Sequence, residues 1–566
     1  MWQQLRERRL IQWVLAYLAG AWALVQVLAW YHGEKGAQRA SAAELIMLAA
    51  ILVIAGAAIT LVRRTAAPEP AQAAGAPAAG ELPPLPVSRE SSIAVLPFTN
   101  LSDDRENEHF SDGLTEELLT DLARSTNLRV ISRTSVMRYK DQELSVREIG
   151  DQLGVAHLVA GSVRRSGTRV RITAQLIDAR VDRHIWAESY DSEWSDIFAI
   201  QREISSKIAG ALRAAIPGQQ HASPTSNPAA YQLYLEGRHL FNQRFDQLAS
   251  EPLRRAENLL RQAVELDPTF TRAWAVLGLV YAHLATRPQT ILPQPEALAR
   301  AQSAIAQAVS LDSMAADAYV ARGIIHLRQL NWAEAEQSFQ RALRAEPQNA
   351  DAYSWYGILL VAVGRSQEAE RVCRRAAELD PINASTLHWL ADALRNSGRI
   401  DESRLYAQRS MDLGMIMSGV GLYIYHVRRG EWTQALEEQE RMLRPQGIDP
   451  AFATALVDAI RDPRGIPAAV ALAEAVTDTT PILETYTPSL FFDLADPGPA
   501  FTAVERLVAR NLGVYSLWRM WEPDFGHMRN HPRFRRLARD TGLLDYWRTH
   551  GWPDLCRPQG DAFACR

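Results

Sequence analysis

The residues of this sequence that could do chemistry begin with a group of acids near position 110. Hard divalent cations prefer sites built from several carboxylates, so such a group could hold one. No glycine-punctuated loop of calcium-binding spacing surrounds these acids, however, and acids are also favoured beside a helix N-terminus. We therefore interpret them as acids at the start of a helix. The group comprises Asp103, Asp104, Glu106, Glu108 and Asp112.

Histidines and cysteines gather towards the C-terminus. His527 and His531 lie four positions apart, which on a helix would place two imidazoles on one face for zinc. Pro532 follows at once and favours a turn instead. Cys556 and Cys565 lie nine positions apart. They would pair in an oxidising compartment and stay reduced in the cytosol, and the sequence leaves both alternatives open.

Familiar catalytic motifs are absent. The sequence has no GxxxxGK[ST], HExxH, GxSxG or CxxC pattern, so it predicts no enzyme and no cofactor. With 566 residues, 47% of them hydrophobic and 22% charged, the chain is too apolar to be disordered throughout. The net charge of −4 gives no basic excess, so we expect no direct nucleic-acid binding. Three cysteines are too few for a disulfide framework.

Two uncharged apolar runs lie near the N-terminus, at residues 10–31 and 45–62. Each is long enough for the ~30 Å hydrocarbon core, so residues 1–64 are predicted to form a two-helix transmembrane hairpin rather than a cleaved signal peptide. Five arginines flank the pair of runs and two basic residues lie between them, which favours a cytoplasmic location for the region that follows. The cysteine pair favours the periplasm instead. Residues 65–90, rich in alanine and proline, are predicted to be a linker.

Residues 91–216 alternate between apolar runs of strand length and helical spacing. Gly154 follows one helical run as a C-cap would, and residues 165–168 are typical of a hairpin turn. The order βαβαβββα predicts an α+β domain with one mixed sheet. The expected strands are 92–98, 128–132, 157–164, 169–177 and 184–190, and the expected helices are 108–125, 146–153 and 197–214.

Several motifs of this region resemble the TolB amino-terminal-type domain. The similarity runs through SIAVLPFTNLSDD, FSDGLTEELL, GSVRRSGTRVRITAQLIDA and HIWAESYD. The resemblance implies a bacterial, membrane-anchored protein that also carries tetratricopeptide repeats, and it implies no catalytic residues. Where relatives usually have a glycine before the last strand, this chain reads ARVDR at 179–183, so we expect a wider turn or one of another type.

Similar segments recur 34 residues apart between positions 313 and 415. A period of 34 residues is that of tetratricopeptide repeats, which are pairs of helices. Gly323 and Gly357 stand at the small-residue position of that pattern, and Ala335, Phe339 and Ala369 stand at positions that pack the two helices together. Residues 227–446 are therefore predicted to form a tetratricopeptide-repeat solenoid. Residues 447–566 are predicted to hold degenerate helical repeats and a C-terminal cap.

These features together predict a multi-domain chain with a transmembrane hairpin, an α+β domain and an all-α repeat solenoid. The predicted function is a non-enzymatic scaffold that binds protein or peptide partners. It is expected to be a multi-pass protein of the bacterial inner membrane, with its soluble region in the cytoplasm. The alternative is a sensory or regulatory component that acts through a separate output protein. Repeat geometry places six candidate partner-binding residues in the concave groove, namely Asp351, Ser354, Ile358, His388, Asp392 and Arg395.

Overall fold

A computed structural model describes residues 91–566 except 103–107, 126–127, 141, 194–196, 213–224, 243–249, 286–291, 480–486 and 510–516. The predicted transmembrane hairpin (1–64) and linker (65–90) lie outside the described residues. Within the described ranges, no helix has the length and apolar character needed to cross a membrane. The expectation of a multi-pass inner-membrane protein is corrected accordingly, because the structure gives it no support.

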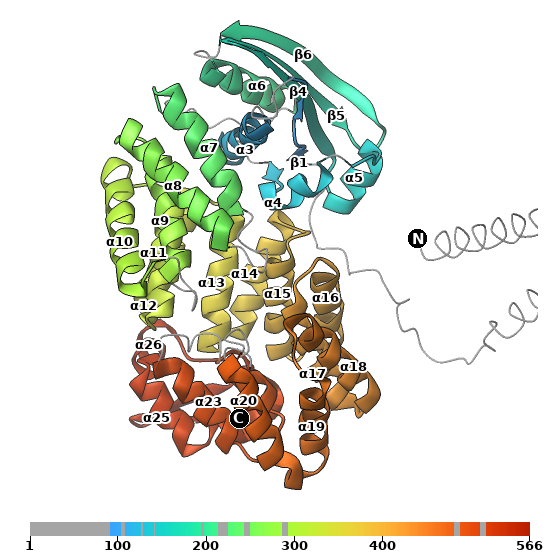
Figure 1. Cartoon of the computed structure of the whole chain (residues 1–566), viewed down its shortest axis with the longest axis vertical. Helices are drawn as coiled ribbons and strands as arrows, with labels where there is room; N and C mark the ends of the chain where they lie inside the picture. The colour runs from blue at the N-terminus through green and yellow to red at the C-terminus, as the bar shows by residue number, and fades with distance from the viewer. Residues whose placement is uncertain are drawn as a thin grey trace, which may run out of the picture. The chain divides into compact units, whose positions relative to one another are not determined.

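The chain begins, within its described part, with an α+β domain built on a six-stranded mixed sheet (Figure 1). The strand order is β3-β1-β4-β5-β6, with β2 paired to β4. Strand β1 is parallel to β3 and β4, whereas β4, β5 and β6 are antiparallel. The strands are β1 (Ser92–Val95), β2 (Thr99–Asn100), β3 (Arg129–Val130), β4 (His157–Ser166), β5 (Arg169–Asp178) and β6 (Arg183–Glu193). The helices are α3 (Glu108–Ser125), α4 (Arg133–Val136), η3 (Met137–Tyr139), α5 (Val146–Leu153) and α6 (Ile197–Ala211).

Local sequence signals account for most of this domain. Helices α3 and α5 have the bounds that the sequence predicted. Gly154 ends α5 in the left-handed region, with φ of +64°, and Ser145 starts it by accepting a hydrogen bond from the Glu148 N–H. Strand β2 and helix α4 were not predicted, because two and four residues are too few to show a period. In the turn before β6, Asp182 adopts the positive φ, +50°, that a glycine would supply more easily.

Pairs of helices form the repeat array that follows (Figure 1). They are α7 (Pro228–Asn242), α8 (Ser250–Leu266), α9 (Thr271–Ala285), α10 (Gln294–Leu311), α11 (Ala316–Arg328), α12 (Trp332–Ala345), α13 (Ala350–Val363), α14 (Ser366–Leu379), α15 (Ala384–Asn396), α16 (Ile400–Asp412), η5 (Ile416–Ser418), α17 (Gly419–Arg429), α18 (Trp432–Leu443) and η6 (Arg444–Gln446). Their bounds fall within the predicted repeat region, residues 227–446.

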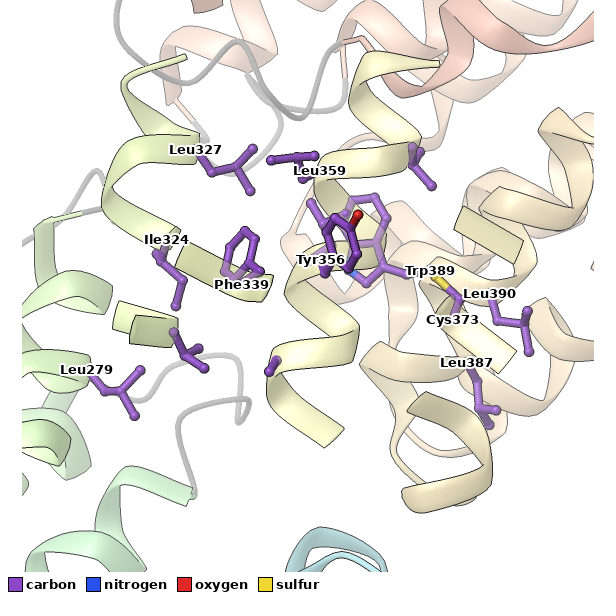
Figure 2. Close-up of a cluster of buried hydrophobic side chains, with 14 of the residues drawn as sticks. Leu279, Ile324, Leu327, Phe339, Tyr356, Leu359, Cys373, Leu387, Trp389 and Leu390 are labelled. Atoms are coloured by element: carbon purple, nitrogen blue, oxygen red, sulfur yellow. The ribbon is translucent and has the colours of Figure 1, made fainter. Parts of the chain in front are cut away.

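Glycine allows the two helices of a repeat to touch. A Cβ atom on Gly323 would lie 2.4 Å from the Phe339 ring, and one on Gly357 would lie 2.4 Å from the Cys373 Sγ. Neither contact is sterically possible, so these positions need glycine. Phe339 and Cys373 are buried in the resulting core, in which Leu359 and Leu390 also lie (Figure 2).

The array continues into shorter helices and ends in a cap. These elements are α19 (Pro450–Arg461), η7 (Pro463–Gly465), α20 (Ile466–Thr479), α22 (Thr487–Phe491), α23 (Gly498–Ala509), η9 (Trp518–Trp521), η10 (Pro523–Phe525), α24 (Gly526–Arg529), α25 (Pro532–Asp540) and α26 (Leu543–His550). A hairpin of β7 (Cys556–Gln559) and β8 (Ala562–Cys565) follows, which the sequence did not predict. Aromatic rings form the core of the cap: the Trp521 ring centroid lies 5.7 Å from that of Trp547 and 5.8 Å from that of Phe534.

Candidate binding face of the repeat array

The six predicted groove residues lie on the first helices of two neighbouring repeats, and we call the surface that they form the α13–α15 face. Asp351 and Ser354 are half-buried. The other four are almost inaccessible, which limits what an added partner could touch. Their exposed fractions are 5% for Ile358, 7% for His388, 2% for Asp392 and 1% for Arg395.

Two of these residues link one repeat to the next. The Ser354 Oγ lies 3.0 Å from the Thr386 Oγ1, which joins α13 to α15. The His388 Nδ1 lies 3.0 Å from the Ser418 Oγ, which joins α15 to η5. Burial lowers the pKa of His388, so the imidazole is neutral at pH 7. Both side chains hold the array together in this structure.

Asp392 and Arg395 belong to a buried ionic cluster. The Arg395 Nη2 donates to the Asp392 Oδ1 at 2.6 Å, and the Arg395 Nε donates to the Glu522 Oε1 at 2.9 Å. The Arg519 Nε donates to the same Glu522 oxygen at 2.9 Å. The Arg519 Nη1 also donates to the Asp493 Oδ2 at 2.8 Å. The cluster therefore joins α15 to the C-terminal part of the chain.

Opposite charges make this burial possible. Arg428 from α17 forms a further ion pair with Glu522, which is itself fully buried. Burial alone would raise the pKa of Glu522, but the guanidinium groups of Arg519, Arg395 and Arg428 lower it to about 2. The carboxylate therefore stays ionised. A buried charge without such partners would cost several kcal/mol, so each member of the cluster depends on the others.

Residues 517–525, which we call the cover segment, lie against the C-terminal ends of α13 and α15. The Trp521 Nε1 donates to the Ala362 carbonyl at 2.9 Å. The Asn396 Nδ2 donates to the Trp518 carbonyl at 2.8 Å. Gly364, at φ of +84°, leaves space for the indole, because a Cβ there would lie 2.6 Å from Trp521. The sequence placed Asp392 and Arg395 in the concave groove, and in the structure the cover segment lies over the face at these two residues.

The α+β domain contacts the opposite ends of the same helices. The Gln348 side chain accepts a hydrogen bond from the Val130 N–H at 3.0 Å and donates to the Leu128 carbonyl at 2.7 Å. The Ser135 hydroxyl donates to the Asp380 Oδ1 at 2.6 Å. Gln348 precedes α13 by two residues and Asp380 precedes α15 by four, so the domain contacts the N-terminal ends of both helices.

Ion pairs extend this contact towards the start of the array. Glu116 of α3 binds two arginines, with the Arg238 Nε at 2.7 Å and the Arg133 Nε at 3.1 Å. Arg238 also reaches Asp317 of α11 at 2.6 Å. Helix α7 is therefore tied both to the α+β domain and to the third helix pair.

The residues first considered as metal ligands have other partners. Within the described ranges, no group of three or more His, Cys, Asp or Glu side chains could hold a metal ion. Asp112 accepts from the Lys140 Nζ at 2.7 Å. His531 accepts from the Arg533 N–H at 3.2 Å and starts helix α25. The acids at 103–106 lie outside the described residues.

Sequence reasoning missed the residues that cover the face. Glu522 gave no signal of its own, because its pair with Arg395 joins residues 127 positions apart and leaves no local period. Trp521 is one of several aromatic residues between positions 520 and 566. The position of Glu522 directly after Trp521 would have been a usable signal of an ion pair, since a carboxylate buried beside an aromatic residue needs a charged partner.

Two family descriptions match parts of the chain. The tetratricopeptide repeat matches residues 296–350, 320–384 and 356–414, so this region is a tetratricopeptide-repeat array. The second domain of the HilA/YgeH-like transcriptional regulators matches residues 89–207. This second match covers the α+β domain. For the same region the sequence motifs resemble the TolB amino-terminal-type domain.

One curated relative is similar over part of its length. It is the putative adenylate cyclase 3 of Rhizobium meliloti (strain 1021), which is 39% identical over 202 residues. These residues are 35% of this chain and 34% of the relative, so the chain spans about a third of the relative's length.

Solved structures of repeat proteins are also similar. YrrB, described as a TPR protein with an unusual peptide-binding site, is 21% identical with a TM-score of 0.26 and coverage of 33% of this chain and 92% of its own. The type IV pilus biogenesis factor PilW is 18% identical with a TM-score of 0.30 and coverage of 38% and 94%. Yeast Tom70 is 15% identical with a TM-score of 0.32 and coverage of 57% and 70%.

Proposed function

We propose that the chain is a non-enzymatic scaffold whose repeat array binds extended segments of protein partners. The observation that carries this proposal is the α13–α15 face, which already holds a segment of the chain itself, the cover segment with its two 3-10 turns η9 and η10. The contacts are of the kind that peptides use: the Trp521 indole donates to a backbone carbonyl, and Arg395 binds a carboxylate. Tetratricopeptide arrays present extended surfaces suited to such segments.

The six candidate residues divide into two sets under this proposal. Asp351 and Ser354 lie at the half-buried edge of the face, where a partner can reach them without any rearrangement. The other four are buried, namely Ile358, His388, Asp392 and Arg395. Arg395 pairs with Glu522 of the cover segment and Asp392 pairs with Arg395, so a partner contacts these two only after the segment has moved away.

A photo-crosslinking amino acid placed at position 351 of the full chain tests the proposal in the native host. Position 351 should give covalent adducts with a small set of proteins, because it lies at the edge of the face. Glu265, an exposed residue near the end of α8, is the matched control position. Adducts of the same composition at both positions, or none at 351, would count against the binding face.

A regulatory role is the second candidate, and two similarities favour it. The α+β domain matches the second domain of a transcriptional-regulator family, and the curated relative is named as a putative adenylate cyclase. In this role the chain would act through a separate output protein. Deletion of the gene should then change the expression of a defined set of other genes, and an unchanged transcript profile would argue against regulation.

The absence of catalytic activity is part of the proposal and has its own assay. Purified full chain, incubated with ATP and either Mg²⁺ or Mn²⁺, should form no more cyclic AMP than a heat-denatured sample. Cyclic AMP that depends on the folded chain would show that it shares the activity for which its relative is named, and would overturn the non-enzymatic proposal.

A further inference from the structure

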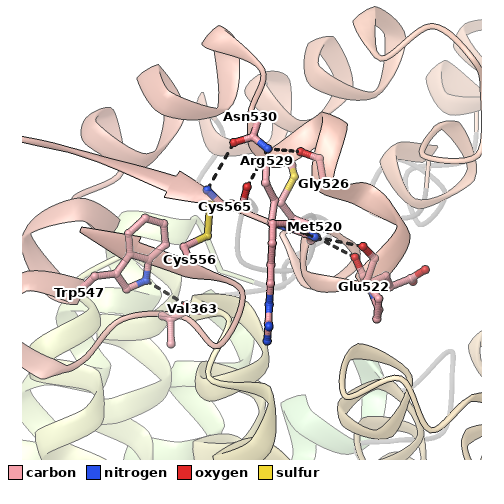
Figure 3. Close-up of a disulfide and its surroundings, with 11 residues drawn as sticks. Val363, Met520, Glu522, Gly526, Arg529, Asn530, Trp547, Cys556 and Cys565 are labelled. Carbon is pink, nitrogen blue, oxygen red and sulfur yellow. Dashed lines mark hydrogen bonds between the residues drawn. A yellow bond between two sulfur atoms is a disulfide. The ribbon is translucent and has the colours of Figure 1, made fainter. Parts of the chain in front are cut away.

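The C-terminal hairpin is closed by a disulfide between Cys556 and Cys565 (Figure 3). The two cysteines lie directly opposite each other in the register of β7 and β8. Cys565 is half-buried and Cys556 is 8% exposed, so the bond lies near the surface of the cap. The bond closes a loop of about ten residues, and such a constraint shifts the equilibrium towards the closed hairpin.

Asn530 and Arg529 fasten the closed end of this hairpin to α24. The Asn530 Nδ2 donates to the Cys565 carbonyl at 2.9 Å, and the Asn530 Oδ1 accepts from the Cys565 N–H at 3.4 Å. The Arg529 Nη2 donates to the Arg566 carbonyl at 2.6 Å. The hairpin is therefore attached to Arg529 and Asn530 through the main chain of Cys565 and Arg566.

Arg529 also holds the cover segment. Its Nη1 donates to the carbonyl oxygens of Met520 and Glu522, each at 2.7 Å (Figure 3). Its Nη2 donates to the Pro523 carbonyl at 3.2 Å. Every hydrogen bond that the structure gives this buried guanidinium ends on a main-chain carbonyl, so Arg529 fixes the path of the backbone at 520–523.

The same backbone stretch presents Trp521 and Glu522 to the repeats. Trp521 bonds to the last turn of α13, and Glu522 pairs with Arg395 of α15. A continuous series of contacts therefore runs from the disulfide through Asn530 and Arg529 to the α13–α15 face. Asp554, two residues before the hairpin, adds a second link, because its N–H donates to the Gly364 carbonyl at 3.1 Å.

We infer that the Cys556–Cys565 disulfide is a redox-controlled lock on the cover segment. A dithiol reductant supplies two electrons and two protons, so the S–S bond breaks, each cysteine gains an S–H, and the reductant leaves as its own disulfide. The opened hairpin then loses its constraint, which corresponds to roughly 100-fold in the hairpin equilibrium. Arg529 loses its hold on the hairpin, and the cover segment separates more often from the face.

This inference rests on the proposed binding function, since it regulates access to the same face. Such a lock explains why Asp392 and Arg395, two of the predicted partner-binding residues, are covered by another segment of the chain. Reduction would convert Asp392 and Arg395 from members of a closed cluster into residues that a partner can reach.

Hydrogen exchange of the full chain, oxidised and after treatment with dithiothreitol, tests the lock without any partner. Reduction should accelerate amide exchange at least tenfold in peptides covering 517–530 and the ends of α13 and α15. Exchange in β4 and β5 of the α+β domain should not change. Because the assay contains no partner, its failure is distinct from failure of the photo-crosslinking experiment.

Two variants make the outcome specific. The double variant Cys556→Ser, Cys565→Ser should exchange like the reduced chain and should not respond to dithiothreitol. Cys373→Ala, which removes the buried cysteine outside the disulfide, should respond like the wild type. Unchanged exchange at 517–530 in a chain whose mass confirms reduction would overturn the lock. Acceleration of equal size throughout the chain would also overturn it, because the bond would then act on global stability.

Discussion

Replacing Glu522 by Gln should lower the free energy of unfolding by about 3 kcal/mol at pH 7. The magnitude follows from its ion pairs with Arg395, Arg519 and Arg428. The pKa of Glu522 is about 2 in the folded chain, against about 4.3 for an unperturbed glutamate. A difference of roughly 2 pKa units corresponds to about 3 kcal/mol. Breaking a buried ion pair costs about 3–5 kcal/mol in general, which agrees with this figure.

The pH dependence of this loss in the free energy of unfolding provides a second test of the role of the Glu522 carboxylate. A carboxyl group whose folded-state pKa is lowered contributes its full stability above the unfolded pKa of about 4.3, and loses that contribution as the pH falls towards 2. The same two pKa values leave roughly half of that contribution at pH 3. The difference between wild type and Glu522→Gln should therefore shrink by about half between pH 7 and pH 3.

Urea denaturation of the full chain, followed by tryptophan fluorescence, measures this difference. Asp524→Asn is the matched control, because Asp524 lies in the same segment and pairs with Arg428 at 3.3 Å while 66% of its side chain is exposed. An exposed pair of this kind contributes little, so the control should unfold like the wild type. A loss below 1 kcal/mol for Glu522→Gln at pH 7, or a loss that is the same at pH 3, would refute the reasoning.

Two further substitutions test how the α13 helix is held at each end. Gly364→Ala should cost about 1–3 kcal/mol in urea denaturation, because its Cβ would meet the Trp521 ring at 2.6 Å. Gly414→Ala, with φ of +101° and nothing within 4 Å, isolates the backbone strain, and equal losses for both would exclude the clash. Gln348→Ala should cost about 1–3 kcal/mol, because it removes hydrogen bonds to the α+β domain. The exposed Gln329→Ala should cost nothing measurable, and a Gln348→Ala variant as stable as this control would contradict the bridging role.

The sequence predicted those parts of the fold that depend on local spacing. The bounds of α3 follow from a helical period, and those of α5 follow from a helical period and from the capping residues Ser145 and Gly154. The repeat array follows from a 34-residue period and from glycines that only a close helix pair requires, such as Gly323 and Gly357. In each case the residues that determine the element lie close together in the sequence, within one helix or within neighbouring repeats.

What covers the repeats could not be predicted in this way. Arg395 and Glu522 are 127 positions apart, and Ala362 and Trp521 are 159 positions apart. Repeat geometry placed the candidate residues on the first helices of two repeats, but no period relates a helix face to the distant segment that covers it. The pairing of Cys556 with Cys565 was likewise open, because spacing alone does not place two cysteines opposite each other in a hairpin.

Helix α13 is in contact with both the α+β domain and the cover segment. Gln348 of the α+β contact lies two residues before the helix, and Ala362 of the cover contact lies in its last turn. The helix has 14 residues, so the two contacts are about 20 Å apart. Sites that far apart are expected to act additively, within about 0.5 kcal/mol, unless a rigid element joins them.

We expect the double variant Gln348→Ala, Glu522→Gln to depart from additivity by more than about 0.5 kcal/mol. The physical reason is that α13 and α15 each have stabilising contacts at both ends. Loss of the contacts at one end lets the helix shift, which changes the free energy that the contacts at the other end contribute. Urea denaturation of the two single variants and the double variant measures the coupling free energy. The pair Gln329→Ala, Glu522→Gln is the control, because Gln329 is exposed and lies outside both contacts. Additive losses in both pairs would mean that the α+β domain and the cover segment stabilise the array independently, with no coupling free energy between them.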